Sequence, residues 1–179
     1  MLRIKTQWGA AIQEACKYSS VPPEFLAALI AGESGGDPSA RRFEKSVYNK
    51  FQNVLRGYVG SYANLSKGDL GALGDAAIRD LATSWGLTQV MGYHTARRPG
   101  GVAILKDPET HLKFALGLVA EFAERFQLSV TTEFTEMFRC WNTGRPNGQT
   151  YDPKYVERGL ARLETYRAIS QSEDRAISG

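Results

Sequence analysis

The sequence has few of the residues that hold metals or cross-link small folds. Among its 179 residues it carries two cysteines, Cys16 and Cys140, and two histidines, His94 and His111. Neither pair has the spacing of a metal site, so we expect no metal and no organic cofactor. For the cysteines two interpretations stay open, a pair of buried free thiols or one disulfide between helices.

Long apolar runs and a strong charge of one sign are also missing. No run approaches the ~20 residues of a membrane-spanning helix. Residues 1–20 lack the apolar core of a signal peptide and have an amphipathic helical pattern, so the chain is either mature or exported by another route. The formal net charge of +3 is too small to indicate nucleic-acid binding. We expect no integral membrane segment, no nucleic-acid partner and a monomer.

Apolar residues at helical spacing are the main feature that is present. The sequence is 42% hydrophobic and 23% charged, which suits a globular chain with one sizeable core. Strong helix starts occur near Pro22, Asp107 and Asp152. The stretch 41–84 is more polar, with two weaker helical patterns, and a short hairpin inside it stays open. We predict a mostly α fold in one domain, residues 1–170, with a frayed tail at 171–179.

The helix that starts near Pro22 ends on a carboxylate, Glu33, in the stretch LIAGESGGDPSA. Glu33 lies three and four residues after Ile30 and Leu29, on the same helix face as the apolar stripe. An apolar wall and a helix C-terminus both disfavour a charged carboxylate, so we predict a raised pKa for Glu33. A carboxylic acid that stays protonated near neutral pH can act as a general acid. The structural alternative is a Glu that faces solvent or pairs with a nearby arginine, Arg41 or Arg42.

Two later segments carry further candidate site residues. The stretch ATSWGLTQVMGYH places Gln89 and Met91 between two glycines. The stretch FRCWNTGRPNG brings Trp141 and Asn142 to a helix end before a Gly- and Pro-containing loop. Taken alone, the first segment is typical of a packing turn and the second of a capped helix end.

In this order the three segments resemble the motifs of the lysozyme-like lytic transglycosylases, which cleave peptidoglycan. The family pattern is Glu-Ser at a helix end, then Gly-Leu-Met-Gln, then aromatic-Asn-Ala-Gly with a later Tyr. The chain has Glu33-Ser34, Gly86-Leu87-Thr88-Gln89, Trp141-Asn142-Thr143-Gly144 and then Tyr155. The resemblance spans roughly residues 10–163. It implies a lysozyme-like domain with helices around a central core helix, here the one that begins at Asp107.

The resemblance also assigns a role to each matched position. Glu33 matches the catalytic acid. The other positions match substrate-binding or orienting residues: Ser34 and Gln89 through hydrogen bonds, Met91 and Trp141 as faces for sugar rings, Asn142 and Tyr155 in the late cleft motif.

The chain departs from the family pattern at three places. Thr88 stands where the family has Met. Trp141 stands where the family has a Tyr whose hydroxyl contacts the catalytic Glu, and an indole N–H can donate but not accept. A helical insertion is expected after Glu33, at about residues 45–81. The stretch ARRFEKSVYNKF faintly resembles phage-type muramidases, in which a second acid follows; here that acid would be Glu44, with an arginine-paired surface Glu as its structural alternative.

These motifs predict cleavage of the β-1,4 bond between N-acetylmuramic acid and N-acetylglucosamine in peptidoglycan glycan strands. One catalytic Glu implies a non-hydrolytic reaction with a 1,6-anhydro product. The alternatives are a muramidase that uses Glu33 and Glu44, and a non-catalytic cell-wall-binding module. Chitin cleavage is a more distant option. The expected place of action is the bacterial cell envelope, periplasmic or extracellular, in a cellular, phage or effector role.

Overall fold

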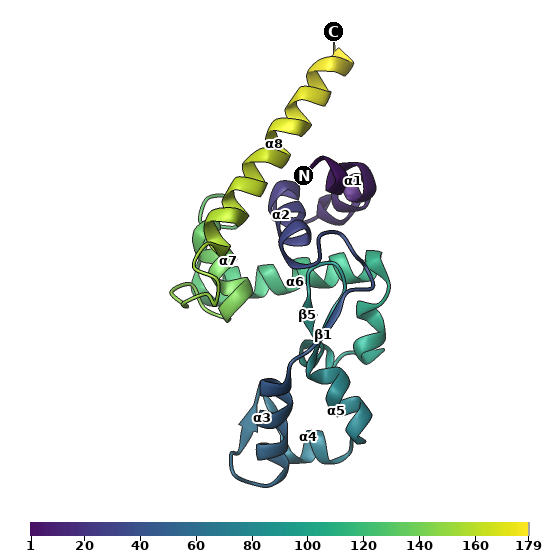
Figure 1. Ribbon diagram of the computed structural model, residues 1–179, viewed down its shortest axis with the longest axis vertical. Coiled ribbons are helices and arrows are strands. Elements are labelled where there is room, and N and C mark those ends of the chain that lie inside the picture. The colour runs from purple at the N-terminus through teal and green to yellow at the C-terminus, as the bar shows by residue number, and fades with distance from the viewer. Residues whose placement is uncertain (179) are drawn as a thin grey trace. The chain divides into compact units, whose positions relative to one another are not determined.

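The computed structural model describes residues 1–178 and is mostly helical, as predicted (Figure 1). The eight α-helices in these residues are α1 (Leu2–Cys16), α2 (Pro23–Glu33), α3 (Lys45–Leu55), α4 (Lys67–Gly71), α5 (Asp75–Leu81), α6 (Pro108–Phe126), α7 (Phe134–Thr143) and α8 (Tyr155–Ser178). The short strands are β1 (Arg41–Phe43), β2 (Ser61–Tyr62), β3 (Leu65–Ser66), β4 (Thr83–Trp85) and β5 (Val90–Met91). Two 3-10 helices follow, η1 (Gly92–Thr95) and η2 (Gly101–Leu105).

The chain forms two compact units, and each is described by itself. The first unit contains residues 1–36 and 112–178, and the second contains Asp37–His111. The predicted single domain of residues 1–170 therefore includes both units. The predicted insertion at about 45–81 lies inside the second unit and is helical, because it contains α3, α4 and α5.

Helix α2 is the buried centre of the first unit. All six residues from Phe25 to Ile30 are buried, so α2 is apolar on every side and needs neighbours all round. Helices α1 and α8 both pack against it, and Figure 1 shows α8 running alongside α2. Phe25 also contacts Phe138 of α7, with ring centroids 4.7 Å apart. The long helix expected to be central is α6, which buries one face, including Leu112 and Val119.

Helix α8 is longer than the sequence predicted. Residues 171–178, expected to be part of a frayed tail, continue the helix to Ser178, and Gly179 lies outside the described residues. Lys5 of α1 explains part of this order. Its Nζ donates to Ser170 Oγ at 2.7 Å and pairs with Glu173 Oε2 at 3.1 Å, which ties the C-terminal turns of α8 to α1.

The second unit combines three short helices with two small antiparallel sheets. One sheet has the order β1-β4-β5, with Arg42 opposite Ser84 and Ser84 opposite Met91. The other is the β2–β3 hairpin, which confirms the hairpin that the sequence left open. Its two turn residues, Ala63 and Asn64, both have positive φ, 51° and 61°, as a tight type I′ connection requires.

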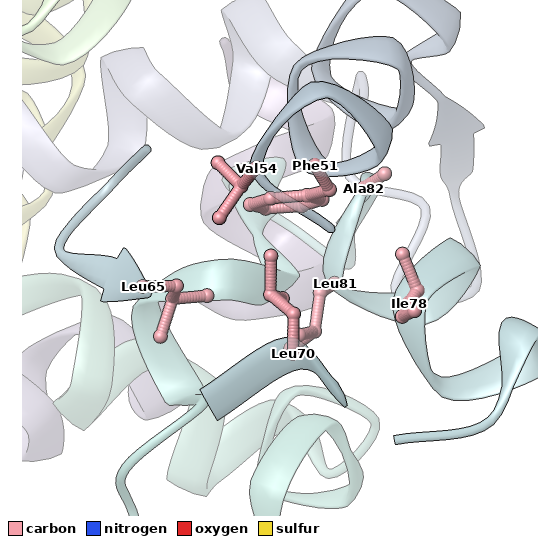
Figure 2. Packing of buried hydrophobic residues seen from close by; sticks show 7 residues of the cluster. All are labelled: Phe51, Val54, Leu65, Leu70, Ile78, Leu81 and Ala82. Atoms are coloured by element: carbon pink, nitrogen blue, oxygen red, sulfur yellow. The ribbon is translucent and has the colours of Figure 1, made fainter. Parts of the chain in front are cut away.

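The second unit has an apolar cluster of its own (Figure 2). The buried members are Phe51, Val54, Leu65, Leu70, Ile78, Leu81 and Ala82. All of them lie in the stretch 41–84, for which the sequence indicated two weaker helical patterns. Leu73 and Tyr58 of the same stretch are exposed. The helical insertion therefore folds around a core, rather than lying on the surface as a polar loop.

Three further findings concern the thiols, the length of the helices and the side chains that could hold a metal ion. Cys16 and Cys140 are buried free thiols, which confirms the first of the two interpretations. Across residues 1–178, no helix combines the length and the apolar character that a membrane crossing needs. The same residues contain no group of three or more His, Cys, Asp or Glu side chains placed to hold a metal ion.

Candidate active site

Glu33 is the last residue of α2, and its carboxylate meets the first residue of α8. The Tyr155 hydroxyl donates a hydrogen bond to Glu33 Oε1 at 2.5 Å. This length is typical of a charge-assisted bond between a hydroxyl and a carboxylate. The ring of Phe138, from α7, packs edge-on against the Tyr155 ring at a centroid distance of 6.4 Å. Three helices of the first unit therefore fix the position of the candidate acid.

The environment of Tyr155 keeps its hydroxyl protonated. Burial is the main cause that raises the pKa of Tyr155 far above its usual range. The Glu33 carboxylate raises this pKa further, and the Arg162 guanidinium opposes the rise. Tyr155 is thus a permanent donor to Oε1 of Glu33. The raised pKa of Glu33 itself stays a prediction.

The turn after Glu33 is held by local hydrogen bonds. Ser34 Oγ donates to the Ile30 carbonyl at 3.3 Å and accepts from the Gly36 N–H at 3.1 Å. Gly36 has φ of 89°, and a Cβ there would lie 2.9 Å from Ile4 Cδ1, so only glycine fits. Its carbonyl accepts from Trp8 Nε1 at 3.0 Å. Ser34 therefore stabilises the helix end that carries Glu33, and its contact with substrate stays a prediction.

Trp141 and Asn142 lie in the last turn of α7, also in the first unit. Trp141 is partly buried and Asn142 is exposed. Gly144 ends the helix in the left-handed conformation, with φ of 79°, and its N–H donates to the Cys140 carbonyl at 2.8 Å. The capped helix end predicted from the sequence is confirmed. In this chain Tyr155 supplies a hydroxyl to Glu33, a contact that the resemblance placed at the position of Trp141.

Gln89 belongs to the second unit and is held inside the turn between β4 and β5. Its Nε2 donates to the carbonyls of Ala40 and Gly86 at 3.1 and 3.0 Å. Its Oε1 accepts from Ser84 Oγ at 2.8 Å. Both amide hydrogens are therefore used within the unit, and only acceptor capacity on Oε1 remains for a ligand. Met91, on β5, is partly buried beside this turn.

Glu44 is the N-cap residue of α3 in the second unit. Its Oε1 accepts from Arg42 Nε at 2.6 Å, in an ion pair whose arginine is largely exposed. The arginine-paired interpretation of Glu44 is therefore the one observed. The structure brings Glu33 into direct contact with Tyr155 in the first unit, whereas Gln89, Met91 and Glu44 all belong to the second.

The structure explains why a threonine, and not the family's methionine, stands at position 88. Its backbone N–H and its Oγ1 both lie within hydrogen-bond distance of His111 Nε2, at 3.1 and 2.8 Å. The other ring nitrogen of His111 is 3.2 Å from the Leu105 carbonyl. A Cβ on Gly86, which has φ of 69°, would lie 2.7 Å from His111 Nδ1. Burial lowers the pKa of His111 to about 4, so the ring is neutral at pH 7.

Arg162 is a residue near the candidate acid that sequence reasoning missed. Its charge acts on Tyr155, and its guanidinium would lie 3.1 Å from a Cβ placed on Gly32, the residue before Glu33. The signal in the sequence was its spacing. Arg162 follows Tyr155 by seven residues, which places both on one face of the same helix.

Comparisons with known proteins add information about the fold. No protein-family model matches the chain, and no curated protein matches it. A solved structure that resembles it is the crystal structure of Burkholderia AP3 phage endolysin, with a TM-score of 0.62. The alignment covers 90% of this chain and 70% of that one at 17% sequence identity. The chain has the fold of a phage endolysin. The predicted lysozyme-like, mostly α fold is thereby confirmed.

Proposed function

We propose that this protein cleaves the β-1,4 glycosidic bond between N-acetylmuramic acid and N-acetylglucosamine in peptidoglycan, with Glu33 as the catalytic acid. The observation that carries the proposal is the partly buried hydrogen bond from Tyr155 to Glu33 at the end of an apolar helix. A carboxylic acid held in this way, on a fold shared with an endolysin, is suited to glycosidic bond cleavage. The proposed partner is a glycan strand, and the proposed place of action is the bacterial cell envelope.

The chemistry begins with proton transfer from Glu33. In this route Oε2 carries the proton to the oxygen between the two sugars, while Tyr155 donates to Oε1. The bond from that oxygen to the anomeric carbon of the muramic acid breaks, which leaves an oxocarbenium-like centre. The sugar's own N-acetyl oxygen can stabilise this centre without a nucleophile from the protein. Glu33, now anionic, then removes the proton of the C6 hydroxyl, whose oxygen closes onto the anomeric carbon as a 1,6-anhydro ring.

The ion pair of Glu44 favours this single-acid route. Its Oε1 already accepts a hydrogen bond from Arg42, so its carboxylate is less available to activate a water molecule. The second candidate is a muramidase in which Glu44 leaves Arg42 and orients that water. The Glu44 side chain is partly exposed at the start of α3, so a water molecule can reach its carboxylate. The two routes differ in their products, since only hydrolysis adds an oxygen from water.

Digestion of purified peptidoglycan in heavy-oxygen water tests the proposal. We expect 1,6-anhydro muropeptides without the label, detected by mass spectrometry, and no products from Glu33→Gln. Labelled muramic acid reducing ends without anhydro masses would replace the transglycosylase route by hydrolysis. Binding to peptidoglycan without any cleavage would leave a cell-wall-binding module.

A further inference from the structure

A pocket rich in arginine lies in the first unit, beside the helix end that carries Glu33. Its volume is about 500 Å³, within the range of sites that hold small organic ligands. Three elements line it: the start of α1, the end of α2 and the first half of α8. The charged lining residues are Arg3, Arg158 and Arg162, and Ala31 and Gly35 form the α2 side.

The three guanidinium groups keep donor capacity for a ligand. Arg3 donates to the Gly35 carbonyl, and Arg158 pairs with Asp152. Arg162 lines the pocket as well, and its charge acts on Tyr155. Each guanidinium has five N–H donors, so most donors of this group are not used by these contacts. One paired carboxylate against three arginines leaves the pocket with an excess of positive charge, which suits an anion.

The pocket continues the helix face that begins at Tyr155. Arg158, Arg162 and Thr165 follow Tyr155 by three, seven and ten residues, which places all four on one stripe of α8. With a rise of about 1.5 Å per residue, Arg158 and Arg162 lie about 4.5 and 10 Å along the axis from Tyr155. Tyr155 itself touches Glu33. A ligand that reaches from the reacting sugar toward the pocket therefore needs to span only about one to two sugar lengths.

We infer that this pocket binds a carboxylate carried by the C3 substituent of muramic acid. That carboxylate belongs either to the lactyl group of a bare glycan strand or to the stem peptide attached to it. The inference rests on the proposed function, and it adds a specificity element. Neutral glycans such as chitin lack the anion, so the arginines would favour muramic acid-containing strands over them.

A purely structural role for the arginines makes a different prediction. Arg3 and Arg158 do tie the chain together, through Gly35 and Asp152. If that were their whole role, removing a guanidinium would lower the melting temperature and affect all ligands alike. A binding role instead affects anionic ligands selectively. Arg162 is the best position for the test, because it lines the pocket and makes neither of these two tying contacts.

Calorimetric titration of the full chain tests the pocket without requiring catalysis. The probes are N-acetylmuramyl-L-alanyl-D-isoglutamine, whose free carboxylate lies in the peptide, and N-acetylmuramic acid, whose lactyl carboxylate is free. The neutral control is N,N′-diacetylchitobiose. We expect Arg162→Ala to weaken binding of at least one muramyl probe about 10-fold, the usual scale for one charge-assisted contact, with N,N′-diacetylchitobiose unchanged. Arg162→Lys should retain part of the binding. Arg125→Ala, which removes an exposed arginine of α6 outside the pocket, should change the binding of none of the three ligands.

A cleavage assay then separates the two sources of the carboxylate. A loss by Arg162→Ala on peptide-bearing strands alone assigns the pocket to the stem peptide. An equal loss on strands stripped by an amidase assigns it to the lactyl group. The inference is overturned if Arg162→Ala binds both muramyl probes as wild type does, if it loses the muramyl probes and N,N′-diacetylchitobiose equally, or if inorganic phosphate binds as tightly as the muramyl probes. A wild-type chain that binds the muramyl peptide but cleaves no strand would refute the proposed function and leave the pocket supported.

Discussion

The two units hold their candidate site residues by different means. In the first unit, Glu33 ends a helix that is buried on every side, and a tyrosine from another helix fixes its carboxylate. In the second unit, Gln89 lies in a turn between two very short strands and is fixed by three hydrogen bonds. Apolar packing of a helix together with one hydrogen bond therefore positions the acid, whereas polar contacts alone position the amide. Substitutions in each unit should distinguish these two ways of holding a side chain in place.

The largest effect is expected for Glu33→Gln. Gln keeps the acceptor for Tyr155 but cannot supply the proton, so we expect a loss of about 10³-fold in peptidoglycan cleavage. The melting temperature near pH 7 should stay the same or rise, because an amide keeps the hydrogen bond from Tyr155 and removes a negative charge from a helix C-terminus. Turbidity loss of a peptidoglycan suspension and thermal unfolding measure the two quantities. Retained cleavage would remove Glu33 from the catalytic role, and a clear loss of stability would make it a structural charge.

Phe51→Ala should break the core of the second unit. Phe51 is fully buried in the cluster of Figure 2, and loss of such a ring costs about 4 kcal/mol of the free energy of unfolding. Amide hydrogen exchange should accelerate in α3, α4 and α5 more than in α2. Phe25→Ala is the matched control, because it removes a buried ring from the first unit. If amide exchange in α2 accelerated as much as in α3, α4 and α5 of the Phe51 variant, the two units would not have separate cores.

His111 should make the second unit sensitive to acid. The pKa of the folded ring is about 4, below its ordinary value of 6.5. As the pH falls through 6.5, the unfolded chain binds a proton that the folded chain rejects. The resulting loss of stability is complete near pH 4 and amounts to about 3 kcal/mol. In His111→Gln this part of the pH dependence should disappear, although the variant starts from lower stability at pH 7. Denaturant unfolding between pH 7 and 4 measures both chains, and parallel curves would exclude His111 as the cause.

The smallest effect is expected for Tyr155→Phe. The ring still packs against Phe138, but Glu33 Oε1 loses its donor. We expect cleavage to fall about 10-fold through a lower kcat, and the free energy of unfolding to change by about 1 kcal/mol. Steady-state kinetics on soluble glycan strands separate kcat from KM. An unchanged kcat would mean that the hydroxyl does not orient the acid.

The sequence predicted the helices well because their apolar spacing is local. The end of α2 at Glu33 and the start of α6 after Asp107 follow from helix-capping chemistry within a few residues. The β1-β4-β5 sheet was not predicted. Its strands have two or three residues each, too few for an alternating pattern, and β1 pairs with β4 across about forty positions of the chain.

The sequence predicted which residues form the candidate site, but not which of them touch one another. Glu33 and Tyr155 were both named, but 122 positions separate them, and no local pattern reveals that they touch. Thr88 was recognised as a departure from the family pattern without a cause. The cause is His111, a partner more than twenty residues away that is buried with it. Such pairings depend on tertiary packing, which motif order does not contain.

The two buried thiols can be used to detect transient opening of the first unit. Burial raises the pKa of Cys16 and of Cys140 to about 11, so only about one thiol in 10⁴ is a thiolate at pH 7. Both belong to the first unit, and among the described residues the second unit has none. The rate at which an alkylating reagent labels the native chain therefore measures how often the helices around Glu33 become transiently exposed.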